Sequence, residues 1–347
     1  MTGELTARDA ALIDAVDVKD VARVEQLLAE GANASCVVYA DSDEAKEKGE
    51  DGLPLLMVAI LGGECDIVRL LVTHGAKTSV TVGALTPLML ACERGRVDIV
   101  VALLASGVSA NTPGAMTLAS GAGHCEVVSA LILGGGDVNE RAIESGAMPL
   151  AVAAAEGHAD VVALLLANGA SPHATTVDGV SPLHAVALRS GSVACARLLL
   201  DAGARADLND SMQRTPFTIA LEKNDCALGR AMLERDRSLV DGVHVVHRKN
   251  AAGVDDDNVD ESSSRNNNGS FNSSSSSNND NYNNNNNFSN INSKSASNRP
   301  FHTPLLFAAI LLEHTEFIAL LLEHGASLEQ RYGRQGLTPV MLAARVE

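Results

Sequence analysis

One pattern of residues recurs through most of this sequence at intervals of about 33 residues. Gly135, Gly169 and Gly203 are successive markers 34 residues apart, and Pro182 and Pro216 are also 34 residues apart. A period of this length is typical of stacked repeats, in which each unit buries its apolar face against the next unit. The sequence therefore predicts an array of small units with many local cores.

The stretch from 146 to 170 shows how one unit folds. Pro149 is suited to the first position of a helix, where its missing N–H costs nothing, and Gly157 ends that helix. Asp160 falls in the first turn of a second helix, where its charge meets the positive end of the helix dipole. From Val161 onward, apolar residues at i, i+3 and i+4 share one face. Helices this short are not stable alone, so we expect neighbouring units to cover them.

A shared motif opens the first helix of several units. It is found in Thr86-Pro87-Leu88-Met89-Leu90-Ala91, Ser181-Pro182-Leu183-His184 and Thr303-Pro304-Leu305-Leu306-Phe307-Ala308-Ala309. With its period, the motif resembles the ankyrin repeat. The resemblance implies an all-α helix-turn-helix solenoid with short finger loops, about eight repeats and a partial ninth. One disordered insert rich in Asn and Ser interrupts this array.

The repeat register divides the chain into six segments. We expect an N-terminal capping repeat (1–36), an acidic loop insertion (37–52), repeats 2 to 7 (53–241), a disordered Asn/Ser-rich insert (242–299), repeat 8 (300–330) and a truncated repeat 9 (331–347). In the capping repeat, Leu12 and Val16 should face inward. Arg8, Asp9 and Asp14 should face solvent on the side that no neighbour covers.

The two insertions leave functional alternatives open. The acidic loop is either a solvated loop or an acidic contact for a basic partner. Residues Asn266 to Asn298 are nearly all Asn and Ser, which offers too little apolar surface to offset chain entropy. A separate hypothesis is that this tract drives self-association of the protein.

Composition narrows the classes of partner. The net charge is −17, aromatic residues make up 3% and Trp is absent. An acidic surface with few aromatic platforms disfavours nucleic acid and favours a neutral or basic protein partner. We expect the chain to be a monomer.

The cysteines and the N-terminus bear on the compartment. The six cysteines occur singly, without a Cys-x-x-Cys pair, which favours reduced core residues over disulfides or zinc ligands. The N-terminus lacks the continuous apolar run of a signal peptide, and no stretch approaches the roughly 20 apolar residues of a membrane span. We therefore expect an intracellular, cytoplasmic protein, with the nucleus as an open alternative.

No motif in the sequence predicts catalysis, a metal site or a cofactor. His184 occupies the motif position at which the family's histidine bonds backbone near the finger, so its expected role is structural. His244 and His247 lack the further ligands of a zinc site. The glycines 134–136 are not followed by the lysine of a phosphate-binding loop. We therefore expect a protein that is not an enzyme.

The family resemblance implies a binding surface at the finger bases and along the first helices. The matching positions are Leu85, Glu93, Arg94, Glu156, Val180, Leu188, Arg189, Arg214, Glu222 and Lys223. Interfaces often concentrate their energy in a few aromatic or Arg side chains, so Arg94, Arg189 and Arg214 are the strongest candidates for anchors.

The leading hypothesis for function is a non-enzymatic scaffold or adaptor that binds a protein partner on its concave and finger-tip surface. The alternative is the N-terminal targeting arm of a larger enzyme or channel that continues beyond residue 347. The ninth repeat, which stops after one helix, supports the alternative but equally fits a longer scaffold.

Overall fold

The structure is a computed structural model that describes residues 6–38, 52–142, 146–189, 192–246, 301–333 and 335–346. The chain divides into two compact units, Met1–Leu239 and Val240–Glu347. The first unit holds seven helix pairs within its described residues, and the second resumes the same pattern after the long insertion.

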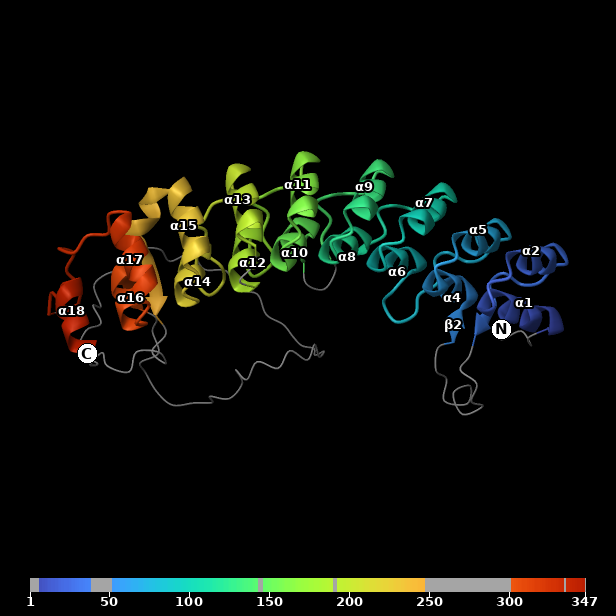
Figure 1. Ribbon diagram of the computed structural model, residues 1–347, viewed down its shortest axis with the longest axis horizontal. Helices are drawn as coiled ribbons and strands as arrows, with labels where there is room; N and C mark the ends of the chain where they lie inside the picture. Colours follow the sequence, from blue (N-terminus) through green and yellow to red (C-terminus); the bar gives the residue numbers. More distant parts are fainter. Residues whose placement is uncertain are drawn as a thin grey trace, which may run out of the picture. The chain divides into compact units, whose positions relative to one another are not determined.

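The helices of the first unit form two rows, which lie on opposite sides of the array in Figure 1. The inner row contains α1 (Ala7–Asp17), α4 (Leu55–Gly62), α6 (Pro87–Glu93), α8 (Ala115–Gly121), α10 (Pro149–Glu156), α12 (Pro182–Arg189) and α14 (Pro216–Glu222). The outer row contains α2 (Val21–Ala29), α5 (Cys65–Thr73), α7 (Val97–Ala105), α9 (Cys125–Leu133), α11 (Ala159–Ala167), α13 (Val193–Asp201) and α15 (Cys226–Arg235). Each helix packs against its counterpart in the next repeat, so the core runs between repeats.

The predicted helix starts and ends are confirmed where the motif is regular. Thr86 caps α6, because its hydroxyl accepts a hydrogen bond from the Met89 amide at 3.2 Å. Pro149 begins α10, and Gly157 ends it with a φ of 87°, a left-handed conformation that glycine adopts without strain. Leu165 is fully buried in the following helix, as its spacing predicted.

The capping repeat contradicts one prediction. Leu12 and Val16 are buried as expected, but Asp9 is only 8% exposed. Its carboxylate accepts hydrogen bonds from the Asn33 amide at 2.7 Å and from the Thr6 amide and hydroxyl. The bond from the Asn33 amide is the main cause that lowers the pKa of Asp9. Asp9 faces inward because it joins the start of α1 to the end of its own repeat.

The first insertion interrupts a short strand pair. Strand β1 (Val37–Val38) pairs antiparallel with β2 (Leu53–Pro54), and the Leu55 amide donates to the Cys36 carbonyl at 2.9 Å. Residues 39–51, which hold nearly all of the predicted acidic loop, lie outside the described residues. Pro54 occupies the cap position of α4, one place before the position that proline takes in α6.

The second unit begins with the same arrangement. After a 3-10 helix η1 (Arg237–Asp241), β3 (Val243–Val246) pairs antiparallel with β4 (Phe301–Pro304), and the Leu305 amide donates to the Gly242 carbonyl at 3.3 Å. Strand β3 thus takes up the first residues of the predicted insert, and residues 247–300 lie outside the described part. Helices α16 (Leu305–Leu311) and α17 (Thr315–Glu323) form the predicted eighth repeat, and α18 (Pro339–Val346) packs on α16.

Candidate functional site

The C-terminal ends of four inner helices, α6, α10, α12 and α14, carry the predicted contact residues at one register. We define the inner-helix strip as Glu93, Arg94, Glu156, Leu188, Arg189, Glu222 and Lys223. All of these residues are exposed except Leu188, which is half-buried. Because the inner helices pack side by side, the strip crosses several repeats and mixes both signs of charge.

Two members of the strip join adjacent repeats. The Arg189 guanidinium lies 2.9 Å from the Glu156 carboxylate, and the two side chains remain 65% and 40% exposed. An exposed pair of this kind contributes about 0 to 1 kcal/mol to stability. The pair therefore presents both charges to solvent while holding them at a fixed place on the surface.

The next repeat continues the strip with Glu222 and Lys223. The Lys223 ammonium donates to the main-chain oxygen of Leu188, at the end of the preceding inner helix. Partial desolvation raises the pKa of Glu222 and lowers the pKa of Lys223. Among the described residues, Arg94 and the adjacent Glu93 form no ion pair, so Arg94 is the cation of the strip that no carboxylate neutralises.

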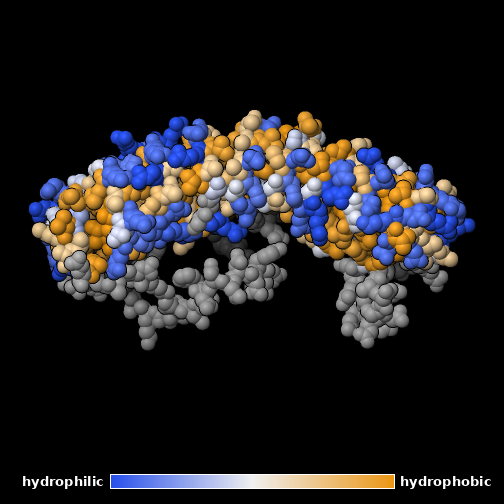
Figure 2. Space-filling model, viewed as in Figure 1, coloured by the Kyte–Doolittle hydropathy of each residue, from blue (hydrophilic) through white to orange (hydrophobic). Residues whose placement is uncertain are grey.

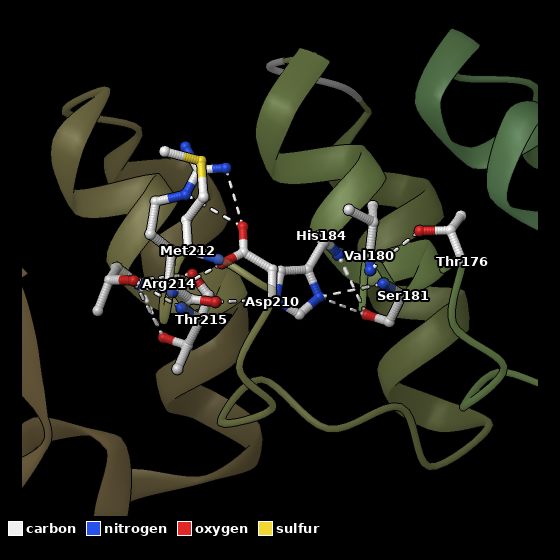
Figure 3. Close-up of polar contacts among 9 residues, drawn as sticks. Thr176, Val180, Ser181, His184, Asp210, Met212, Arg214 and Thr215 are labelled. Carbon is white, nitrogen blue, oxygen red and sulfur yellow. Dashed lines mark hydrogen bonds and ion pairs between the residues drawn. The ribbon is translucent and has the colours of Figure 1, made fainter. Parts of the chain in front are cut away.

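Arg214 has a structural role that its sequence position did not reveal. Its guanidinium donates to the Asp210 carboxylate at 2.8 and 3.1 Å, and its side chain is only 20% exposed (Figure 3). The other Asp210 oxygen accepts from the amides of Met212 and Arg214, both at 2.8 Å. Arg214 therefore holds the finger closed, and little of it remains for a partner.

His184 links this finger to the preceding repeat, as the motif predicted. It is fully buried, and its Nδ1 accepts hydrogen bonds from the Ser181 amide and hydroxyl at 3.2 and 2.8 Å. The proton consequently lies on Nε2, which donates to the Arg214 carbonyl at 3.1 Å (Figure 3). Burial lowers the pKa of His184. Both ring nitrogens are thus engaged: Nδ1 within its own repeat, and Nε2 in the bond that joins it to the next repeat.

The predicted apolar members lie at the finger bases and are half-buried. Leu85 forms a bridge with Val82, while the Val180 amide donates to the Thr176 hydroxyl at 3.2 Å. The sequence predicts a finger-tip surface but did not identify its exposed apolar residues, Val177 at 90% and Met212 at 52% exposed. The sequence feature that could have identified them is an apolar residue within a short polar turn. Val177 precedes Asp178 in one finger, and Met212 follows Ser211 in the next.

The described segments contain neither a metal-type cluster nor a membrane-spanning helix. Within them, no group of three or more His, Cys, Asp or Glu side chains is placed to hold a metal ion. In the same segments, no helix has the length and apolar character needed to cross a membrane.

Comparison with known proteins assigns the family. The model of the family described as ankyrin repeats (3 copies) matches residues 12–114 and 150–240, together more than half of the chain. This is an ankyrin-repeat protein. A comparison with curated proteins finds no significant match over the sequence.

Solved ankyrin-repeat domains share this fold. The ankyrin repeat domain of Bcl-3, described as a unique member of the IkappaB protein family, is 26% identical with a TM-score of 0.51, covering 60% of this chain and 92% of that domain. The human ASB11 ankyrin repeat domain is 27% identical with a TM-score of 0.54, covering 65% of this chain and 97% of that domain. Ankyrin repeats are generally non-enzymatic modules of protein–protein interaction.

Proposed function

We propose that this ankyrin-repeat protein is a scaffold or adaptor that binds a protein partner through the inner-helix strip and the neighbouring finger tips. The observation that carries the proposal is the exposed ion pair between Arg189 and Glu156, which fixes two charges across adjacent repeats. Arg94 adds an exposed cation elsewhere on the same strip.

The chemistry of the strip indicates what a partner needs. Arg side chains form bidentate bonds with carboxylates and stack on aromatic rings, so they favour a partner that places such groups opposite Arg94 and Arg189. The chain as a whole carries a net charge of −17, which favours approach of a neutral or basic protein over an acidic one. The partner therefore combines a neutral or basic surface with local acceptors for the two arginines.

Affinity capture with the full chain as bait tests the proposal. The test bait carries Arg94→Ala and Arg189→Ala, and Arg214 is left intact because its side chain holds the finger closed. A matched control carries Arg69→Ala and Arg230→Ala, which remove two exposed arginines from the outer helices α5 and α15. Circular dichroism verifies that all baits are folded.

We expect a protein that the wild type and the outer-helix control retain and that the Arg94/Arg189 variant loses. Equal capture by all three baits would show that the strip is the wrong surface. Capture lost from both double variants would point to a general effect of net charge and would also contradict the proposal.

A further inference from the structure

The outward-facing side of the outer helices changes character along the first unit. In each outer helix from α5 to α15, two positions four residues apart share this side. They hold Arg69 and Thr73 in α5, Val101 and Ala105 in α7, Ser129 and Leu133 in α9, Ala163 and Ala167 in α11, Arg197 and Asp201 in α13, and Arg230 and Glu234 in α15. The three central helices thus carry no charge at these positions, whereas α5 carries one charge and α13 and α15 carry two each.

We call this surface the outer apolar patch and define it as Val101, Ala105, Ser129, Leu133, Ala163 and Ala167. It is continuous, because α9 packs between α7 and α11. Figure 2 shows apolar atoms over the outer ends of α9 and α11 and hydrophilic atoms over α13 and α15. Beyond the patch, the Arg197 guanidinium pairs with the Glu234 carboxylate at 3.1 Å, so these charges on α13 and α15 neutralise each other.

Leu133 dominates the patch. It is 86% exposed, and the equivalent positions on the two neighbouring helices hold Ala105 and Ala167. Gly134 follows it directly, so no large neighbour covers its side chain. A protruding Leu between small residues is a shape that a partner's side chains can surround, and Val101, which is 47% exposed, extends the apolar area.

An acidic edge runs beside the patch. The first turns of α7, α9 and α11 contain Asp98, Glu126 and Asp160, all exposed, and these three helices contain no basic residue. Asp98 pairs with Arg96 at 3.0 Å. Glu126 and Asp160 form no ion pair within the described residues, so they leave two negative charges on neighbouring repeats.

We propose that the outer apolar patch docks an amphipathic helix of a partner protein, with its apolar face around Leu133 and basic residues opposite Glu126 and Asp160. This site lies on the outer helices and is separate from the inner-helix strip. A second copy of this chain fits less well, because the same faces of α7, α9 and α11 would bring only further acidic residues to the edge.

The spacing of the repeats sets the spacing in the bound helix. Adjacent packed helices lie about 8 to 10 Å apart, and a helix rises about 1.5 Å per residue. A helix that crosses α9 and α11 therefore meets successive acidic residues about every five to seven residues. Basic residues at i and i+7, on one edge of an apolar face, complement the site.

The probe is a labelled synthetic helix of about 20 residues with a Leu face and two lysines seven residues apart. Its binding to the full chain is measured by fluorescence anisotropy. Leu133→Ser should weaken binding at least tenfold, and the mostly exposed side chain makes a folding defect from this change small. Val18→Ser, which alters a 72% exposed apolar residue between α1 and α2, should leave the Kd unchanged.

The charge requirement is tested separately. Glu126→Gln with Asp160→Asn should weaken binding of the probe at least threefold and make that binding less dependent on salt. Asp66→Asn, at the equivalent position of α5, should change neither the binding nor its salt dependence. A probe with glutamates in place of its lysines should bind at least tenfold more weakly.

Three outcomes would overturn the inference: no effect of Leu133→Ser on the folded chain, an equal effect of Val18→Ser, or a dimer in sedimentation that Leu133→Ser dissociates while the probe fails to bind. Probe binding should persist in the Arg94→Ala, Arg189→Ala variant. Failure here is therefore distinguishable from failure of the inner-helix strip as a partner site.

Discussion

The His124 Nε2 atom lies 3.0 Å from the main-chain oxygen of Glu93, the last residue of α6 in the preceding repeat. The imidazole ring also covers Gly95, where an added Cβ would lie 2.6 Å from the ring. His158 repeats this arrangement one repeat later, with its Nε2 atom 2.9 Å from the Gly121 oxygen. Its ring covers Gly123, where an added Cβ would lie 2.6 Å from the ring. Gly95 and Gly123 thus supply a left-handed turn and also the space into which the next repeat inserts a ring.

This packing predicts that Gly95→Ala is more destabilising than backbone strain alone. Gly107→Ala is the matched control, because Gly107 also has a positive φ but an added Cβ would meet no atom within 4 Å. We expect a loss of about 1 to 2 kcal/mol for the control. For Gly95→Ala we expect about 2 to 4 kcal/mol, because His124 must also move and lose its hydrogen bond. Urea denaturation measures both, and equal losses would show that the ring contact contributes nothing.

The finger of one repeat also holds the turn of the next. The side-chain Nδ2 of Asn139 donates to the Gly169 carbonyl at 3.1 Å, and its Oδ1 accepts from the main-chain amide of Ser171 at 2.9 Å. Asn139→Ala should therefore lower the free energy of unfolding by about 1 to 2 kcal/mol. Asn209→Ala, at an exposed finger position whose side chain makes no comparable bond in the described residues, should change it by less than about 0.5 kcal/mol. Thermal denaturation of the two variants checks this, and indistinguishable melting temperatures would contradict it.

Stability should fall in mildly acidic solution because of His184. Its pKa in the folded protein is below the ordinary value of about 6.5, so the unfolded state binds more protons as the pH drops through that value. The free energy of unfolding should decrease from pH 7 to pH 5, by at most about 1.4 kcal/mol per pH unit for one site. Urea denaturation at each pH gives the free energy of unfolding. In His184→Gln this free energy should change less steeply with pH than in the wild type. An unchanged pH dependence would mean that another titratable group controls stability between pH 7 and pH 5.

The repeat register could be predicted from sequence, because proline and glycine mark helix ends at fixed positions, as Pro149 and Gly157 do in α10. The short strand pairs could not, because two to four residues are too few to show a strand's alternation. Arg214 was predicted as a contact residue because the register places it at a finger base. Its partner Asp210 is four residues away in a non-helical turn, where spacing does not indicate which side chains meet.

Burial between repeats gives a direct test of that register. Leu165 is fully buried in α11, so Leu165→Ala should cost about 2 to 5 kcal/mol through lost contacts and a cavity. Leu166, the next residue, is half-buried, and its replacement by Ala should cost less. Denaturant midpoints of the two variants measure the difference. A cost below about 0.5 kcal/mol for Leu165→Ala would mean that the predicted register of this helix is wrong.

Titration calorimetry with the protein recovered by affinity capture tests the central claim most directly, namely that the inner-helix strip binds a partner. The account predicts that Arg94→Ala with Arg189→Ala raises the Kd at least tenfold, about 1.4 kcal/mol, whereas Arg69→Ala with Arg230→Ala leaves it within about twofold of wild type. Equal affinities for wild type and both double variants, with all three proteins folded, would contradict the claim.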